Sequence, residues 1–94
     1  MLNFEWDPKK AASNLKKHGI SFEEACTVFG DTLSLTISDS LTSSNEERFV
    51  TTGETSHRKL VVVVHVDKGD NVRIISARRD TKHERKTYEK STPG

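Results

Sequence analysis

A histidine and a lysine at the end of a predicted helix are the residues best suited to acid–base chemistry. Lys17 and His18 directly precede Gly19, and an imidazole titrates near neutral pH, so it can take or give a proton in a reaction. A histidine at this place can equally serve only to hydrogen-bond the last carbonyl groups of the helix. The pattern favours both interpretations to a similar degree.

Arginines on or beside predicted strands are candidates for binding an anion, because the planar guanidinium fork matches phosphate oxygens. They are Arg48, Arg73, Arg78 and Arg79. Strand alternation puts Arg73 and Arg79 on one face, with Ile75 and Ala77, and Arg78 on the other. One phosphate can then meet them all only if the strand end twists or bulges. We expect Arg78 or Arg79 to be functional and Arg73 to be more structural, and the alternative for each is pairing with an acid such as Glu84.

Metal ligands and thiols are scarce. The chain has a single cysteine, Cys26, which excludes an intramolecular disulfide and argues against a cysteine-based zinc site. Carboxylates are not crowded as a magnesium site requires. We therefore expect no metal and no other cofactor, and Cys26, on an apolar helical face, is expected to be a buried small hydrophobe.

Charge is unevenly distributed along the 94 residues, although the net charge is only +1. Residues 1–47 hold four basic and eight acidic side chains, and residues 48–94 hold eleven basic and six acidic ones. The halves therefore carry −4 and +5. A basic second half is what binding to a polyanion would need, although solvated charge on helices and strand edges gives the same composition.

The first third of the chain predicts a short strand and two helices. Residues Asn3 to Trp6 fit a strand. Asp7 and Pro8 are typical of a helix start, and Gly19 is typical of a helix end. The expected apolar stripe of this helix is Ala11, Ala12 and Leu15. Ser21 then begins a second helix that ends at residues 30–31, and Glu24 is expected to complete a capping box.

The rest of the chain predicts an antiparallel meander followed by a helix. Strands are expected over residues 33–37, 48–52, 58–67 and 72–78, with a loop over 38–45 and a hairpin turn over 68–71. Thr81 and Glu84 form a capping box that opens a polar helix to about Lys90. The prediction is one α+β domain, residues 1–94, with a four-stranded antiparallel sheet covered on one side by the first two helices. The last helix has a weak apolar stripe and is expected to pack loosely.

The sequence resembles the BrnT toxin family along nearly its whole length. In the first half the shared residues are Phe4-Glu5-Trp6-Asp7-Pro8, Lys10, Asn14, the run from Lys17 to Ala25, Phe29 and Asp31. In the second half they are Arg48, Gly53, the run from Arg73 to Arg78, Glu84, Arg85 and Tyr88. Their order and spacing make the resemblance specific.

The resemblance implies a ribonuclease toxin of a type II toxin–antitoxin module with a RelE-like fold. It implies cleavage of RNA without a metal, inhibition of translation, and neutralisation by a BrnA-like antitoxin in a complex of two toxins and two antitoxins. DNA would be contacted only through the antitoxin. The N-terminus shows no apolar signal and no segment reaches transmembrane length, so we expect a cytoplasmic protein without membrane contact.

Metal-free RNA cleavage needs a base, an acid and cations around the phosphate. The candidates for catalysis are His18, Arg48, Arg78, Arg79 and Tyr88, and those for RNA binding are Lys17, Arg73, Lys82, His83 and Arg85. Tyr88 and His83 can stack on bases or donate protons, although core packing explains Tyr88 equally well. His65 is better explained as a packed, hydrogen-bonded side chain and His57 as a solvated loop residue.

A second hypothesis is a catalytically inactive RelE-like module that holds an antitoxin or RNA, because the sequence contains no clean catalytic triad. Direct DNA binding by this chain is disfavoured. The helix where a recognition helix would lie carries Glu23 and Glu24 in place of cations.

Overall fold

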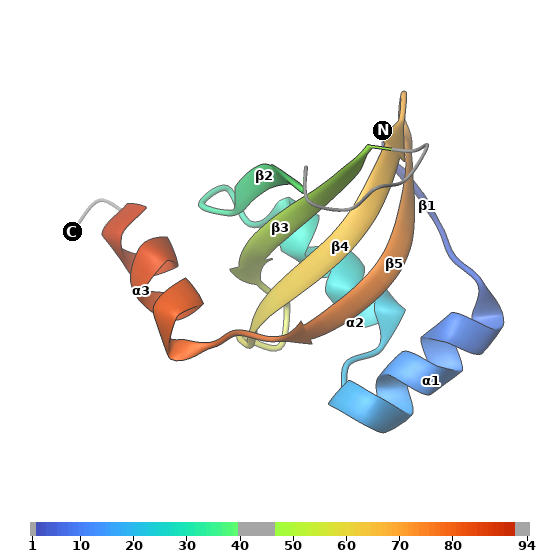
Figure 1. Cartoon of the computed structure of the whole chain (residues 1–94), viewed down its shortest axis with the longest axis horizontal. Helices are drawn as coiled ribbons and strands as arrows, with labels where there is room; N and C mark the ends of the chain where they lie inside the picture. The colour runs from blue at the N-terminus through green and yellow to red at the C-terminus, as the bar shows by residue number, and fades with distance from the viewer. Residues whose placement is uncertain (1, 40–46, 92–94) are drawn as a thin grey trace.

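The computed structural model describes residues 2–39 and 47–91 of the chain (Figure 1). The elements follow in the order β1 (Asn3–Glu5), α1 (Pro8–His18), α2 (Phe22–Cys26), η1 (Thr27–Gly30), β2 (Leu35–Asp39), β3 (Arg48–Glu54), β4 (Leu60–Lys68), β5 (Asn71–Arg79) and α3 (Lys82–Ser91). The α+β class and the order of elements agree with the prediction. The loop predicted over 38–45 is shorter at its start, because Ser38 and Asp39 belong to β2, and its residues 40–45 lie outside the described part.

Among the described residues the sheet has five strands, one more than the predicted four-stranded meander. Its order is β1-β5-β4-β3-β2, with the antiparallel meander of β2 to β5 as predicted. The additional strand is β1, which pairs parallel to β5 with Phe4 opposite Val72. Pairing places Phe4 over the core, where its ring packs 5.3 Å from that of Phe29. The N-terminal strand is thus held by both backbone pairing and aromatic packing.

Local capping signals explain most helix ends. The Asp7 carboxylate accepts from the Lys9 N–H at 2.8 Å, and Gly19 ends α1 with a left-handed φ of 71°. Ser21 caps α2 by accepting from the Glu24 N–H. The expected reciprocal bond from the Glu24 side chain is replaced, because that carboxylate accepts from the Thr55 hydroxyl at 2.8 Å in the β3–β4 connection. The predicted second helix is also two elements, a short α2 followed by the 3₁₀ turn η1.

The core lies between one face of the sheet and the α1–α2–η1 layer. Its buried members come from α2 and the segments beside it and from β4 and β5, and include Phe22, Val28, Val63 and Ile74. In Figure 1, α3 stands apart from that layer, beyond the end of β5. The α1–α2–η1 layer does not cover the second face of the sheet, which we call the open face, although Val62 and Val66 on it are buried.

Candidate functional site

A small pocket lies where α1 meets the edge of β5. It is a shallow hollow of about 200 Å³, wide open to solvent, and is lined by Lys10, Ser13, Asn14, Lys17, His18, Ile75 and Ser76. The five α1 residues follow the spacing i, i+3, i+4, i+7, i+8, which is one face of a helix. The sequence prediction found Lys17 and His18 but missed Lys10, Ser13 and Ser76. The polar spacing on α1 is the signal that would have indicated Lys10 and Ser13.

Asn14 fixes this face of α1 against β5. It is 7% exposed. Its amide nitrogen donates to the carbonyl oxygens of Ile20 at 3.0 Å and Ala77 at 2.8 Å, and its amide oxygen accepts from the Ala77 N–H at 3.1 Å. The expected apolar stripe is wrong at Leu15, which is 51% exposed. A buried amide therefore takes the place that the prediction gave to a leucine.

A bulge in β5 changes which arginines share a face. The register shifts between Val64 and His65, so that Val64 pairs with Ser76 whereas His65 pairs with Ile74. Ile75 is the extra residue, and it lines the α1 pocket. Because paired residues of antiparallel strands point to the same side, the bulge reverses the alternation on one half of β5.

The predicted side of Arg73 is therefore wrong, whereas the predicted placement of Arg78 and Arg79 on opposite faces is confirmed. Arg73, paired with Val66, and Arg78, paired with Val62, lie on the open face. Arg79 pairs with Val61 and lies on the core face at the exposed end of the strand. Arg48 is also on the open face. It lies two residues before Val50 on β3, and Val50 pairs with Val64, whose side chain is on that face. Arg48, Arg73 and Arg78 thus share one surface, which Ser76 joins to the His18 pocket.

Arg78 is engaged by α3. Its Nη1 and Nη2 atoms donate to the two carboxylate oxygens of Glu84 at 2.9 and 2.7 Å. The hydrogen bonds from Arg78 lower the pKa of Glu84 despite partial burial, and the Thr81 N–H and hydroxyl add to that shift. The same hydrogen bond with Glu84 raises the pKa of Arg78. The predicted capping box is confirmed, because Glu84 accepts from the Thr81 N–H and Thr81 accepts from the Glu84 N–H.

The other candidates on α3 lie away from His18. The Tyr88 hydroxyl donates to Asp31 at 2.6 Å. Burial and then Asp31 raise the pKa of Tyr88 to about 12. Burial also acts to raise the pKa of Asp31, but hydrogen bonds from the Glu54 N–H, Tyr88 and the Leu33 N–H together lower it. Tyr88 therefore fastens α3 beside β3, whereas His18 lies beside β5.

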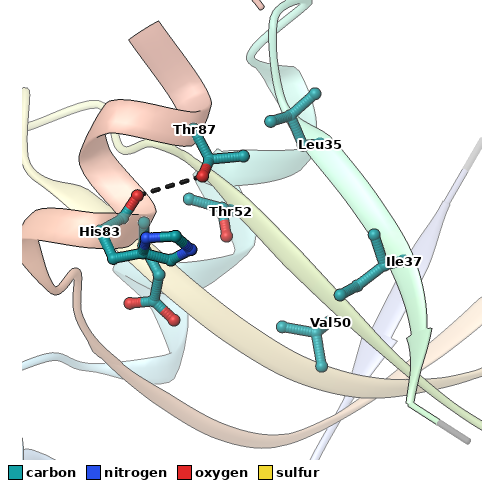
Figure 2. A pocket seen from close by; sticks show the side chains of 7 residues that line it. Leu35, Ile37, Val50, Thr52, His83 and Thr87 are labelled. Atoms are coloured by element: carbon teal, nitrogen blue, oxygen red, sulfur yellow. Dashed lines mark hydrogen bonds between the residues drawn. The ribbon is translucent and has the colours of Figure 1, made fainter. Parts of the chain in front are cut away.

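The remaining basic candidates on α3 are exposed. Arg85 donates to Asp80 at 2.9 Å, and Lys82 opens the helix. His83 lines a second, larger hollow of about 310 Å³ between α3 and the open face of β2 and β3 (Figure 2). Its lining is Leu35, Ile37, Val50, Thr52, His83, Glu84 and Thr87. We call this hollow the α3 groove.

His65 is a buried structural residue, as its position predicted. It is 1% exposed, and its Nε2 lies 2.7 Å from the Thr51 hydroxyl and its Nδ1 2.6 Å from the Asp67 carboxylate. The ring also packs edge-on against Phe29. His57 is solvent-exposed, with its side chain 67% exposed and 3.5 Å from Glu24.

Cys26 is half-buried rather than fully buried. Burial and then the nearby Glu23 raise the pKa of its thiol to about 11, so the thiolate is rare at neutral pH. Within residues 2–39 and 47–91, no group of three or more His, Cys, Asp or Glu side chains is placed to hold a metal. None of the described helices combines the length and hydropathy needed to cross a membrane.

Fold and site together define a small α+β protein with a histidine–lysine pocket beside an arginine-bearing sheet face. The sequence matches, over residues 6–84, the family described as ribonuclease toxin, BrnT, of type II toxin–antitoxin systems. The chain therefore belongs to the BrnT family of ribonuclease toxins, and an antitoxin is its expected partner.

The structure is also similar to a solved one, the ribonuclease toxin BrnT of Brucella abortus. The TM-score is 0.65 at 19% sequence identity, and the alignment covers 87% of this chain and all of the Brucella chain. At this identity the likeness shows a shared fold. None of the curated proteins searched matches the sequence.

Proposed function

We propose that this chain is a metal-independent endoribonuclease whose cleavage centre is the His18 pocket. The observation that carries the proposal is that the His18 pocket and the open face of the sheet meet at Ser76. Ser76 lines the pocket with His18 and lies on the open face of β5 between Arg73 and Arg78. An RNA strand lying along that face would have a phosphate beside the imidazole.

The pocket holds the groups that such cleavage requires. The neutral imidazole of His18 takes the proton of the 2′-hydroxyl, whose oxygen attacks the adjacent phosphorus. The ammonium groups of Lys10 and Lys17 stabilise the added negative charge, and one of them can protonate the leaving 5′-oxygen. Proton transfer and charge stabilisation are thus supplied by side chains of this chain.

The arginines bind and orient the strand. Arg48, Arg73 and Arg78 supply phosphate contacts on the open face, and Lys82, His83 and Arg85 extend the basic surface onto α3. Arg79 lies at the strand end on the other side, and Tyr88 is tied to Asp31. In this proposal Arg79 and Tyr88 are not catalytic.

The decisive experiment is cleavage of single-stranded RNA by purified, antitoxin-free protein in excess EDTA. We expect cleavage by the wild type and a loss of about 100- to 10,000-fold in His18→Gln, the usual contribution of a general base. His57→Gln is the matched control, because His57 is exposed and outside the pocket. Intact RNA with folded wild-type protein, or equal activity of His18→Gln, contradicts the proposal.

A second candidate function is an inactive binding module. It is favoured by the Arg78–Glu84 pair, which occupies a guanidinium that an active enzyme would present to phosphate. Induced expression separates the two. Growth arrest that is lost in His18→Gln supports the enzyme, and unaffected growth with wild-type protein supports the module.

The cellular setting follows from family membership and from the proposed activity. RNA cleavage would inhibit translation in the cytoplasm, and a BrnA-like antitoxin would neutralise it in a complex of two toxins and two antitoxins. DNA would be contacted only through the antitoxin. A relation of the fold to RelE-type ribonucleases belongs to the same proposal.

A further inference from the structure

The α3 groove is an aliphatic hollow with one basic wall. Leu35, Ile37 and Val50 form its floor on β2 and β3, as Figure 2 shows. Ile37 is 65% exposed and is the most exposed of the large apolar side chains in the described chain. Apolar surface left open beside polar residues is typical of a docking site.

The wall formed by α3 is positively charged. His83 and Thr87 line the groove, and Lys86 and Lys90 share their helix face by the spacing i, i+3, i+4, i+7. The one acidic lining residue, Glu84, is already paired with Arg78 at 2.7 Å. The groove therefore suits an occupant that carries aliphatic side chains flanked by carboxylates.

We propose that the α3 groove receives an amphipathic helix of the antitoxin, with aliphatic residues on one face and Asp or Glu along its flank. The proposal rests on the toxin function and deepens it by naming the surface. A helix fits the space because α3 and the sheet offer two walls, as in helix-in-groove recognition. RNA suits the floor less, because bases stack on aromatic faces and the floor residues Leu35, Ile37, Val50 and Thr52 have none. His83 on the wall is the one aromatic ring in the lining.

Occupation of the groove would also block the open face. Glu84 lines the groove and bonds Arg78 directly. The distance between β3 and β5 across the sheet is two strand spacings, about 10 Å. A helix with its side chains has a similar diameter. A helix seated over β2 and β3 therefore covers the approach of RNA to Arg78. This gives neutralisation without contact with His18.

Two variants in complex with the antitoxin of the same module test the surface. Ile37→Lys is expected to weaken antitoxin binding about 10- to 100-fold, the effect of losing one buried aliphatic anchor. Leu2→Lys is the matched control, because Leu2 is 45% exposed next to β1, at the opposite edge of the sheet. Lys86→Glu is expected to weaken binding severalfold, and Lys16→Glu on α1 is expected to leave it unchanged.

Hydrogen exchange of the toxin, free and in the complex, locates the occupant. Protection of residues 35–37, 50–52 and 83–87 supports the proposal. Protection confined to other segments overturns it, as does equal binding by Ile37→Lys and Leu2→Lys. The proposal is also overturned if the antitoxin gives no protection of the groove and another occupant does. That occupant would be an uncleavable deoxy analogue of the RNA, or a second copy of the chain whose self-association Ile37→Lys abolishes.

The two proposals fail separately. Ile37→Lys should retain the RNA cleavage of the wild type in the absence of antitoxin, because Ile37 lies outside the His18 pocket. If wild-type protein cleaves no RNA while the antitoxin protects the groove, the ribonuclease proposal fails and the docking surface stands. If RNA is cleaved and the groove is unprotected, the reverse holds.

Discussion

Arg78 of β5 and Glu84 of α3 form a two-pronged ion pair, with both guanidinium Nη atoms within 2.9 Å of the carboxylate oxygens. The pair joins the open face of the sheet to the helix that closes the α3 groove. It also competes with any phosphate for the same guanidinium. The strength of this pair therefore bears on both stability and RNA binding.

Glu84→Gln separates the two roles of Glu84, because glutamine still completes a capping box. We expect the free energy of unfolding to fall by about 0.5–1 kcal/mol, a small value because both side chains are partly exposed. RNA affinity should rise, and the dependence of log affinity on log salt should steepen by about 0.7, one added phosphate contact for a single strand. Urea unfolding and salt titrations measure these changes. Unchanged RNA affinity would show that Arg78 does not contact RNA.

The ion pair also predicts a loss of stability in acid. The pKa of Glu84 and that of Asp31 are lowered in the folded protein from ordinary values of 4.5 and 3.8. Each carboxylate therefore contributes stability that is fully present above its ordinary pKa and is lost as pH falls through the lowered one. The difference in unfolding free energy between wild type and Glu84→Gln should shrink as pH falls below 4.5. A difference that stays constant with pH would contradict the assignment.

Tyr88 offers a direct titration, because it is the single tyrosine of the chain. Phenolate absorbance should rise with a midpoint near 12, above the ordinary 10. The contribution of Tyr88 to stability is therefore fully present below pH 10 and is lost as pH rises towards 12. Asp31→Asn should move the midpoint part of the way towards 10, since burial remains. A wild-type midpoint at 10 would show that the Tyr88–Asp31 bond is not formed in solution.

Asn14→Ala should be among the most destabilising single changes. It leaves the buried backbone groups of Ala77 and the carbonyl of Ile20 without their partner. We expect a loss of about 3 kcal/mol, as for unsatisfied buried polar groups. Leu15→Ala, at the adjacent exposed position, is the control and should change stability by about 0.5 kcal/mol or less. If the two variants lose the same free energy of unfolding, Leu15 holds α1 on the sheet as much as Asn14 does, and the assignment of Asn14 is wrong.

Gly53 is required by close packing rather than by backbone freedom. A Cβ atom there would lie 2.8 Å from Cγ1 of Val28 and 3.0 Å from Cβ of Ser34. Gly53→Ala is expected to cost about 1–3 kcal/mol, the usual effect of overfilling a core. Gly30→Ala is the control, since nothing lies within 4 Å of its added carbon. Thermal unfolding of both variants tests this, and similar midpoints would contradict the close packing.

The local features of the fold could be predicted because they depend on neighbours in the chain. The Asp7 and Ser21 caps, the left-handed Gly19 and the Thr81–Glu84 capping box each join residues a few positions apart. The family signature and the position of His18 at the end of α1 were equally readable. The face of Arg73 was not, because counting alternate residues along β5 assumes an unbroken register.

The sequence by itself determined the α+β class, the helix ends, the basic second half and the family. The tertiary structure decided which residues meet. The bulge at Ile75 turned Arg73 to the side of Arg78, the buried Asn14 brought Lys10 and His18 against Ser76, and Glu84 closed on Arg78. Each outcome depends on how strands and helices fit together around the core. Packing and register are set by contacts between residues far apart in the chain, which local periodicity does not encode.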